Sequence, residues 1–153
     1  MRKQGRIGTN PPFEAAPSVL SIAATMEPER EEILLQLRDL VLALPGATER
    51  AVYDGFCREW TPAYYLGERQ LCHVHNFRSG LRGSMFIGVK KLEPLILDSQ
   101  RVSSRLRHLV ARTPPGRGTK MVKVPLENPA DAQGFLELVR VKWESEGGIR
   151  VCV

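Results

Sequence analysis

Residues 60–89 constrain the fold of this chain more than any other segment. The run holds three stretches of aromatic or alternating residues, joined by short connections at 67–69 and 78–83 that are rich in glycine and charge. Connections this short join antiparallel neighbours, because parallel strands need a long crossover. The run therefore predicts a three-stranded antiparallel meander.

Helical patterns lie on both sides of the meander. Before it, apolar residues recur at helical spacing from Pro28 to Leu44, and proline suits a first helical turn. After it, we expect a helix that starts at residue 91 or 92, is interrupted or bent at 98–100 and continues through 101–111. A loop at 113–118, a fourth strand at 120–126 and a last helix capped by Asn128 complete the chain.

This order of elements, α-βββ-α-β-α, predicts a two-layer α+β domain. We expect an antiparallel sheet of about four strands with the helices on one face. A chain of 153 residues fits one domain, which we place at 26–146, followed by a flexible tail at 147–153. Residues 1–25 are rich in proline, glycine and basic side chains, so we expect a disordered leader, upstream of a natural start at Met26.

The composition is that of an ordinary globular protein, with 42% apolar and 25% charged residues. No run approaches the ~20 apolar residues of a membrane-spanning helix, so we expect no membrane segment. The three cysteines, Cys57, Cys72 and Cys152, are an odd number at irregular spacing. Free thiols in a reducing compartment explain them best, which predicts a cytoplasmic protein.

An ordered set of short motifs gives a resemblance to a known group. The motifs are LPGA at 44–47, AVYDGF at 51–56, GRGT at 116–119, VPL at 124–126 and NP at 128–129. Through them, residues 30–144 resemble the YdhG-like group of small uncharacterised bacterial α+β proteins. The resemblance implies the fold, and it implies no reaction, cofactor or catalytic residue, because the group has no settled activity.

The predicted middle strand has two mixed faces, since Leu71, His73, His75 and Phe77 alternate with Cys72, Val74 and Asn76. Ligand pockets combine apolar walls with a few polar groups. We therefore predict that the meander carries a cleft for a small ligand or a partner. The residues expected to line it are Trp60, Tyr64, Tyr65, His73, His75 and Phe77.

The sequence does not complete a metal site or a catalytic group. His73 and His75 could share one ion, but a site needs further ligands, and the candidates Cys57 and His108 are not placed by the sequence. We therefore assign no metal ligand and no cofactor. Cys72 and His73 point to opposite faces of a strand, which disfavours a nucleophile and base pair. Asp54 is as well explained by a turn as by acid-base chemistry, and the sequence contains no catalytic motif, so whether the protein is an enzyme stays open.

The alternative hypothesis is nucleic-acid or anion binding through a basic stripe. Its residues are Arg101, Arg105, Arg112, Arg117 and Lys120, on and after the second long helix. Such stripes contact phosphates in a salt-dependent manner. Aromatic side chains do not interleave with these charges, as stacking on single strands requires, so nucleic acid is not the favoured partner. A small molecule, a protein or a second copy of the chain stays open as the partner.

Overall fold

The computed structural model describes residues 15–148 of the chain. The helices are α2 (Val19–Ala24), α3 (Pro28–Leu42), α4 (Leu92–Leu97), α5 (Ser104–Arg112) and α6 (Pro129–Ser145). The strands are β1 (Ala47–Asp54), β2 (Glu59–Leu66), β3 (Arg69–Phe77), β4 (Gly80–Gly88) and β5 (Thr119–Pro125).

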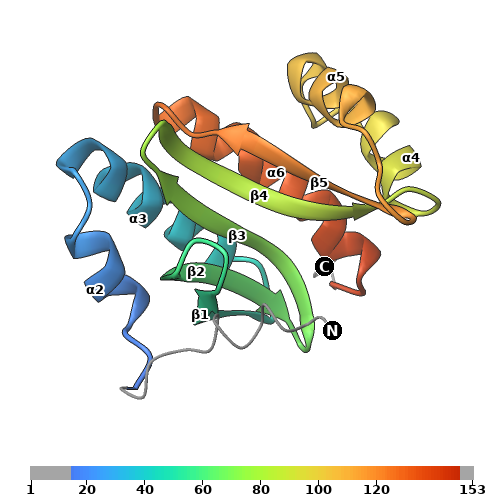
Figure 1. The fold of residues 1–153 in the computed structure, drawn as a ribbon. Coiled ribbons are helices and arrows are strands. Elements are labelled where there is room, and N and C mark those ends of the chain that lie inside the picture. The colour runs from blue at the N-terminus through green and yellow to red at the C-terminus, as the bar shows by residue number, and fades with distance from the viewer. Residues whose placement is uncertain (1–14, 149–153) are drawn as a thin grey trace.

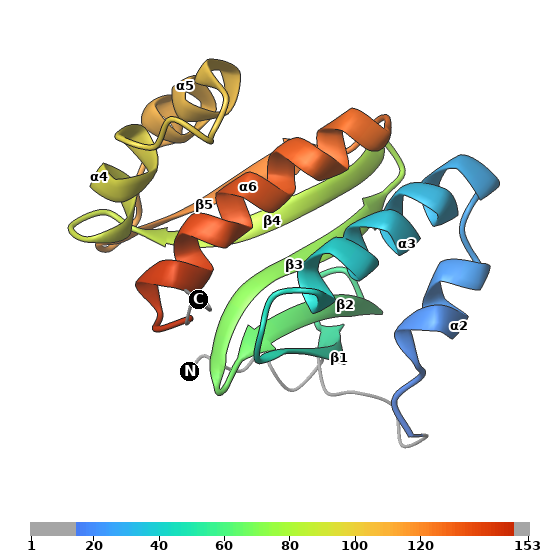
Figure 2. The same cartoon turned by 180° about the vertical axis from the view of Figure 1, so that it is seen from behind.

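The strands form one antiparallel sheet in the order β1-β2-β3-β4-β5, so each strand lies beside its neighbour in the sequence. Helices α3 and α6 run side by side across one face of this sheet, as Figures 1 and 2 show from opposite sides. We call the opposite face, which carries His73, His75 and Phe77, the open face. The predicted α+β class and the meander at 60–89 are confirmed.

The sheet has five strands, and the prediction of about four is wrong. The missed strand is β1, which pairs with β2 along its whole length, from Ala47 opposite Leu66 to Asp54 opposite Glu59. It lies at the edge of the sheet, and none of its side chains is fully buried. An edge strand of this kind gives a weak hydrophobic period, which explains why the sequence pattern did not reveal it.

The second helical region is interrupted between residues 97 and 104, so it forms two helices, as one form of the prediction allowed. Ser103 is the N-cap of α5, and its hydroxyl accepts a hydrogen bond from the N–H of Leu106 at 3.2 Å. Helices α4 and α5 lie at the β4–β5 end of the sheet, apart from α3 (Figure 1). The predicted cap of α6 is confirmed, since Asn128 Oδ1 accepts from the N–H of Asp131 at 3.0 Å.

Residues 19–24 correct the prediction of a disordered leader over residues 1–25. They form α2, in which Val19 and Ala23 are buried, and the helix contacts α3, β1 and β2. The earlier part of the leader, residues 1–14, and the end of the predicted tail, residues 149–153, lie outside the described residues.

The core lies between the sheet and the layer of α3 and α6. Phe135 of α6 is fully buried and packs on Gly83 of β4, where an added Cβ would lie 2.6 Å from the Phe135 ring. Glycine at this position therefore lets α6 lie close to the sheet. Within residues 15–148, no helix is long and apolar enough to cross a membrane.

Candidate functional site

The turn between β1 and β2 places two polar side chains over the open face. Asp54 ends β1, and its Oδ1 accepts hydrogen bonds from the N–H groups of Phe56 at 2.9 Å and Cys57 at 3.2 Å. An aspartate that accepts from the backbone two and three residues later fixes the turn that follows it. The turn thereby carries Cys57 toward His75 on β3.

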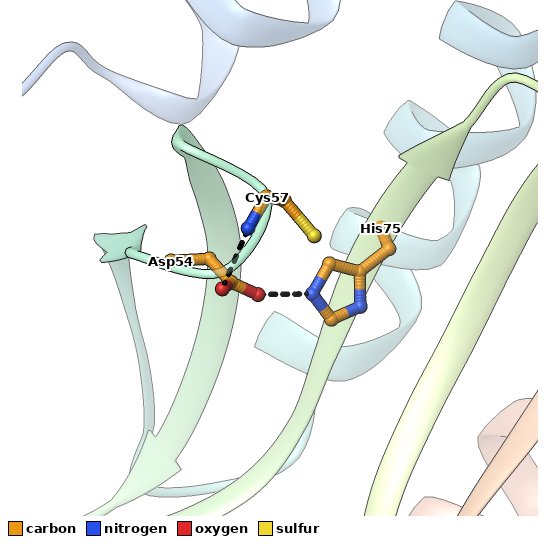
Figure 3. A group of neighbouring side chains, drawn as sticks. All are labelled: Asp54, Cys57 and His75. Carbon is orange, nitrogen blue, oxygen red and sulfur yellow. Dashed lines mark hydrogen bonds and ion pairs between the residues drawn. The ribbon is translucent and has the colours of Figure 1, made fainter. Parts of the chain in front are cut away.

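Asp54, Cys57 and His75 form one cluster (Figure 3). One donor atom from each residue, a carboxylate oxygen, a thiol sulfur and an imidazole nitrogen, lies within 4.8 Å of the other two. Asp54 Oδ2 is 2.7 Å from His75 Nε2. His75 is 6% exposed, while Asp54 and Cys57 are half-buried, so the cluster opens toward the side of the turn.

Two buried polar atoms of β3 and β4 lack a hydrogen-bond partner. In residues 15–148, the buried side-chain atoms without a hydrogen bond are His75 Nδ1 and Ser84 Oγ. Ser84 lies on β4 directly opposite His73 in the strand register, so both atoms belong to neighbouring strands. Buried polar atoms are nearly always paired, because an unmade hydrogen bond costs about 1 to 3 kcal/mol. The local structure therefore leaves one hydrogen-bonding atom of His75 and one of Ser84 unsatisfied.

The charge state of the cluster follows from these contacts. Burial opposes ionisation of Asp54, but hydrogen bonds from His75 and from the backbone of Cys57 and Phe56 outweigh it and lower the pKa of this carboxyl. The ionised carboxylate only accepts, so His75 Nε2 donates the proton in their bond. Burial raises the pKa of the Cys57 thiol most, and the negative charge of Asp54 raises it further. The thiol is therefore protonated, which argues against a cysteine nucleophile.

A cleft of about 290 Å³ on the open face adjoins the cluster. It is lined by Val52, Tyr53, Asp54, Gly55, Thr61, Ala63, Gln70, His73 and Phe86. Asp54 therefore belongs both to the cleft and to the cluster. His73 Nδ1 lies 2.8 Å from Gln70 Oε1, and burial, together with the neighbouring His75, lowers the pKa of His73 to about 4. Its imidazole is neutral at pH 7.

The six residues that we predicted to line the cleft occupy different parts of the structure. His73, His75 and Phe77 share the open face, where the His75 and Phe77 rings stack with centroids 5.0 Å apart. The placement of Tyr64 in the cleft is wrong. Its side chain is fully buried on the helix-covered face, where its hydroxyl donates to Glu49 at 3.0 Å.

Trp60 and Tyr65 also lie apart from the cleft. Trp60 is on the same face of β2 as Tyr64 and makes an edge contact with Tyr53, their ring centroids being 5.4 Å apart. The Tyr65 ring stacks under the Arg50 guanidinium, 4.0 Å from its carbon, and its hydroxyl accepts from Gln70 at 3.3 Å. Tyr65 therefore supports Gln70, which in turn holds His73.

The structure corrects the predicted basic stripe at one residue. Lys120 is the clear error, because it is buried and its ammonium pairs with Glu93 at 2.8 Å. Arg101 precedes α5 and Arg117 lies in the following loop, and both are exposed. Arg105 and Arg112 lie on α5 and line a separate cavity.

Of the two residues that join His75 in the cluster, Cys57 was a candidate metal ligand from the sequence, and Asp54 was not. Cys57 joins His75, whereas His73 is not a member and His108 is on α5. The sequence suggests a turn residue or a general acid or base at Asp54, and not a metal ligand. The Asp-Gly pair at the end of β1 is the signal that could have identified it, because Asp-Gly marks a tight turn whose carboxylate faces the backbone.

Comparison with known proteins finds no match to this chain among family models, curated proteins or solved structures. The resemblance to the YdhG-like group therefore stays a prediction.

Proposed function

We propose that this protein binds a small ligand on the open face of its sheet, and that the ligand includes a divalent transition-metal ion held by Asp54, Cys57 and His75. The observation that supports the proposal is the convergence of three different donor types within 4.8 Å. Carboxylate, thiolate and imidazole are the three side-chain groups that zinc takes in proteins.

The donors suit one ion after a small rearrangement, in which the 2.7 Å Asp54–His75 pair opens slightly and the ion displaces the imidazole and thiol protons to solvent. Zinc bonds of about 2.0 to 2.3 Å place neighbouring ligand atoms of a tetrahedral site on the order of 3.5 Å apart. His75 is held by the sheet, whereas Cys57 is half-buried on a turn, so its side chain supplies the movement. Asp54 Oδ1 keeps its bonds to the turn while Oδ2 faces His75.

The electrostatics of the cluster also favour a cation. The Asp54 charge that raises the pKa of the Cys57 thiol has no basic side chain paired with it, among the described residues, other than His75. A divalent ion would reverse this effect and stabilise the thiolate. Three protein ligands leave a fourth position free on a tetrahedral ion. That position would face the adjoining cleft, where Gln70, His73 and Phe86 would contact an organic ligand.

The test is cobalt(II) titration of the reduced, metal-free protein. Cobalt(II) replaces zinc in tetrahedral sites and gives a sulfur-to-metal absorption band only when a thiolate is a ligand. We expect the band in the wild-type protein and its loss in Cys57→Ser, which changes one atom. Asp54→Asn and His75→Gln should weaken binding by at least roughly tenfold, the lower end of effects seen for altered metal sites.

His108→Gln is the matched control, because His108 is an exposed histidine on α5 and should bind cobalt as the wild type does. Circular dichroism of each variant establishes that it is folded. Absence of the band in the wild type would refute the metal proposal. Persistence of the band in Cys57→Ser would assign the thiolate to Cys72 or Cys152 and would refute it equally.

A further inference from the structure

A second cavity, of about 390 Å³, lies between α5, β5 and the start of α6. Its lining residues are Ser103, Arg105, Leu106, Leu109, Arg112, Lys123, Val124, Pro125, Ala130, Asp131 and Gly134. None of them belongs to the Asp54 cluster or to the cleft beside it. We propose that this cavity binds an amphipathic organic anion, a carboxylate or phosphate head on an aliphatic chain.

Arg105 and Arg112 provide the charge that would recognise the head group. They are about two helical turns apart on α5, so both project to the same side of the helix. Within the described part of the chain, no acidic side chain forms an ion pair with either guanidinium. Arginine binds carboxylate and phosphate through paired N–H donors, and such charge-assisted bonds are among the strongest polar contacts.

The acidic residue and the lysine of the lining make contacts of their own. Asp131 Oδ2 accepts the N–H of Glu127 at 2.8 Å, so this carboxylate is bound to the turn before α6. The Lys123 ammonium lies 5.3 Å from the centre of the Phe77 ring, which is on the open face of the sheet. The two arginines are therefore the cations available to a bound anion.

The rest of the lining is apolar and has room for a hydrocarbon chain. Leu106, Leu109 and Val124 form walls, and no aromatic ring is present. Gly134 of α6 opens the cavity, since an added Cβ there would meet only Leu106 Cδ1, at 3.7 Å. Ligand cavities are commonly about 300 to 1,000 Å³ and mostly apolar with few polar groups, and this cavity fits that description.

These features of the cavity favour a small amphipathic anion over a nucleic acid as its ligand. Nucleic-acid binding needs many phosphate contacts over an extended surface, or aromatic rings for base stacking. Here Lys120 is paired with Glu93, and Arg101 and Arg117 do not line the cavity. Two arginines above an apolar wall match one charged group with an aliphatic body.

The experiment measures binding of decanoate and decyl phosphate, below their micelle concentrations, by calorimetry and by amide shifts of the labelled protein. We expect both probes to bind and to shift α5, β5 and the start of α6. Decanol, which lacks the charge, and acetate or inorganic phosphate, which lack the chain, should bind at least roughly tenfold more weakly, as expected for loss of a charged hydrogen bond or of buried apolar area. If one decyl probe binds and the other does not, the head group is assigned to carboxylate or to phosphate.

Two sets of variants locate the site. Arg105→Gln and Arg112→Gln should each weaken binding, whereas Arg101→Gln and Arg117→Gln should leave it unchanged, because those arginines lie outside the cavity. Gly134→Leu should fill the cavity and abolish binding, while Gly134→Ala should retain it. The surface arginine variants keep the test valid even if Gly134→Leu does not fold.

Three results would overturn the proposal. They are equal binding of decanol and decanoate, unchanged binding in both arginine variants, and no binding of either decyl probe, whether or not duplex DNA binds at low salt through Arg105 and Arg112. The two sites share no residue. The outcome of these binding experiments is therefore independent of the outcome of the cobalt titration.

Discussion

Replacing Lys120 by methionine tests whether one buried ion pair attaches the α4–α5 region to the sheet. The Lys120 ammonium, on β5, donates to Glu93 Oε2 at 2.8 Å and to the carbonyl of Val110 at 2.9 Å. It thus joins α4, near Glu93, to the last turn of α5. The side chains of Lys120 and Glu93 are only 4% and 13% exposed, so little water reaches the pair.

The expected loss in unfolding free energy follows from this burial. Removal of one partner from a buried pair leaves the other charge without compensation and costs about 3 to 5 kcal/mol. Methionine is unbranched and apolar like the lysine stem and only one atom shorter than the whole side chain, so packing contributes little to this value. A domain of ordinary stability has about 5 to 15 kcal/mol in total. Lys120→Met should therefore be among the most destabilising single changes on β5.

The assay is urea unfolding followed by tryptophan fluorescence, with the free-energy change taken from the midpoint and slope. Lys90→Met is the matched control, because Lys90 is exposed and should change stability by no more than about 0.5 kcal/mol. The double variant Lys120→Met/Glu93→Leu should recover much of the loss, since an apolar pair often replaces a buried ion pair at little cost. A loss below about 1 kcal/mol in Lys120→Met, or strict additivity in the double variant, would refute the reasoning.

Two further predictions concern the core. Gly83→Ala should destabilise the protein by about 1 to 3 kcal/mol through its clash with Phe135, whereas Gly88→Ala, which meets no atom within 4 Å, should be nearly neutral; equal effects in thermal unfolding would contradict this. Burial raises the pKa of the Cys72 thiol from 9.0 to about 12, so the stability due to the neutral thiol is present below pH 9 and is lost as pH rises toward 12. Urea midpoints should then fall more steeply above pH 9 in the wild type than in Cys72→Ala, and parallel slopes would exclude this contribution.

The sequence predicted the local features of the fold and missed those that depend on distant pairing. The meander and the Asn128 cap were predictable, because alternation and capping act within a few residues. β1 was not, because an edge strand with polar side chains has no clear period.

The same difference applies to the candidate site. His75 and Cys57 were visible as possible ligands, but their meeting depends on the β1–β2 turn folding over β3. The pairing of Lys120 with Glu93 depends likewise on how α4 packs against β5. A side chain's role in such contacts follows from tertiary structure, which periodicity does not encode.

The sequential strand order has a consequence for folding kinetics. Each of the first three strand pairs closes through a short connection, so these hairpins require little loop-closure entropy and should form early. The contact between α3 and α6 joins the two ends of the domain and closes the longest loop in it. We expect truncations in the α3–α6 contact, such as Leu37→Ala, to accelerate unfolding and to change the refolding rate little. The helix layer would then be the last part of the protein to assemble and the first to separate.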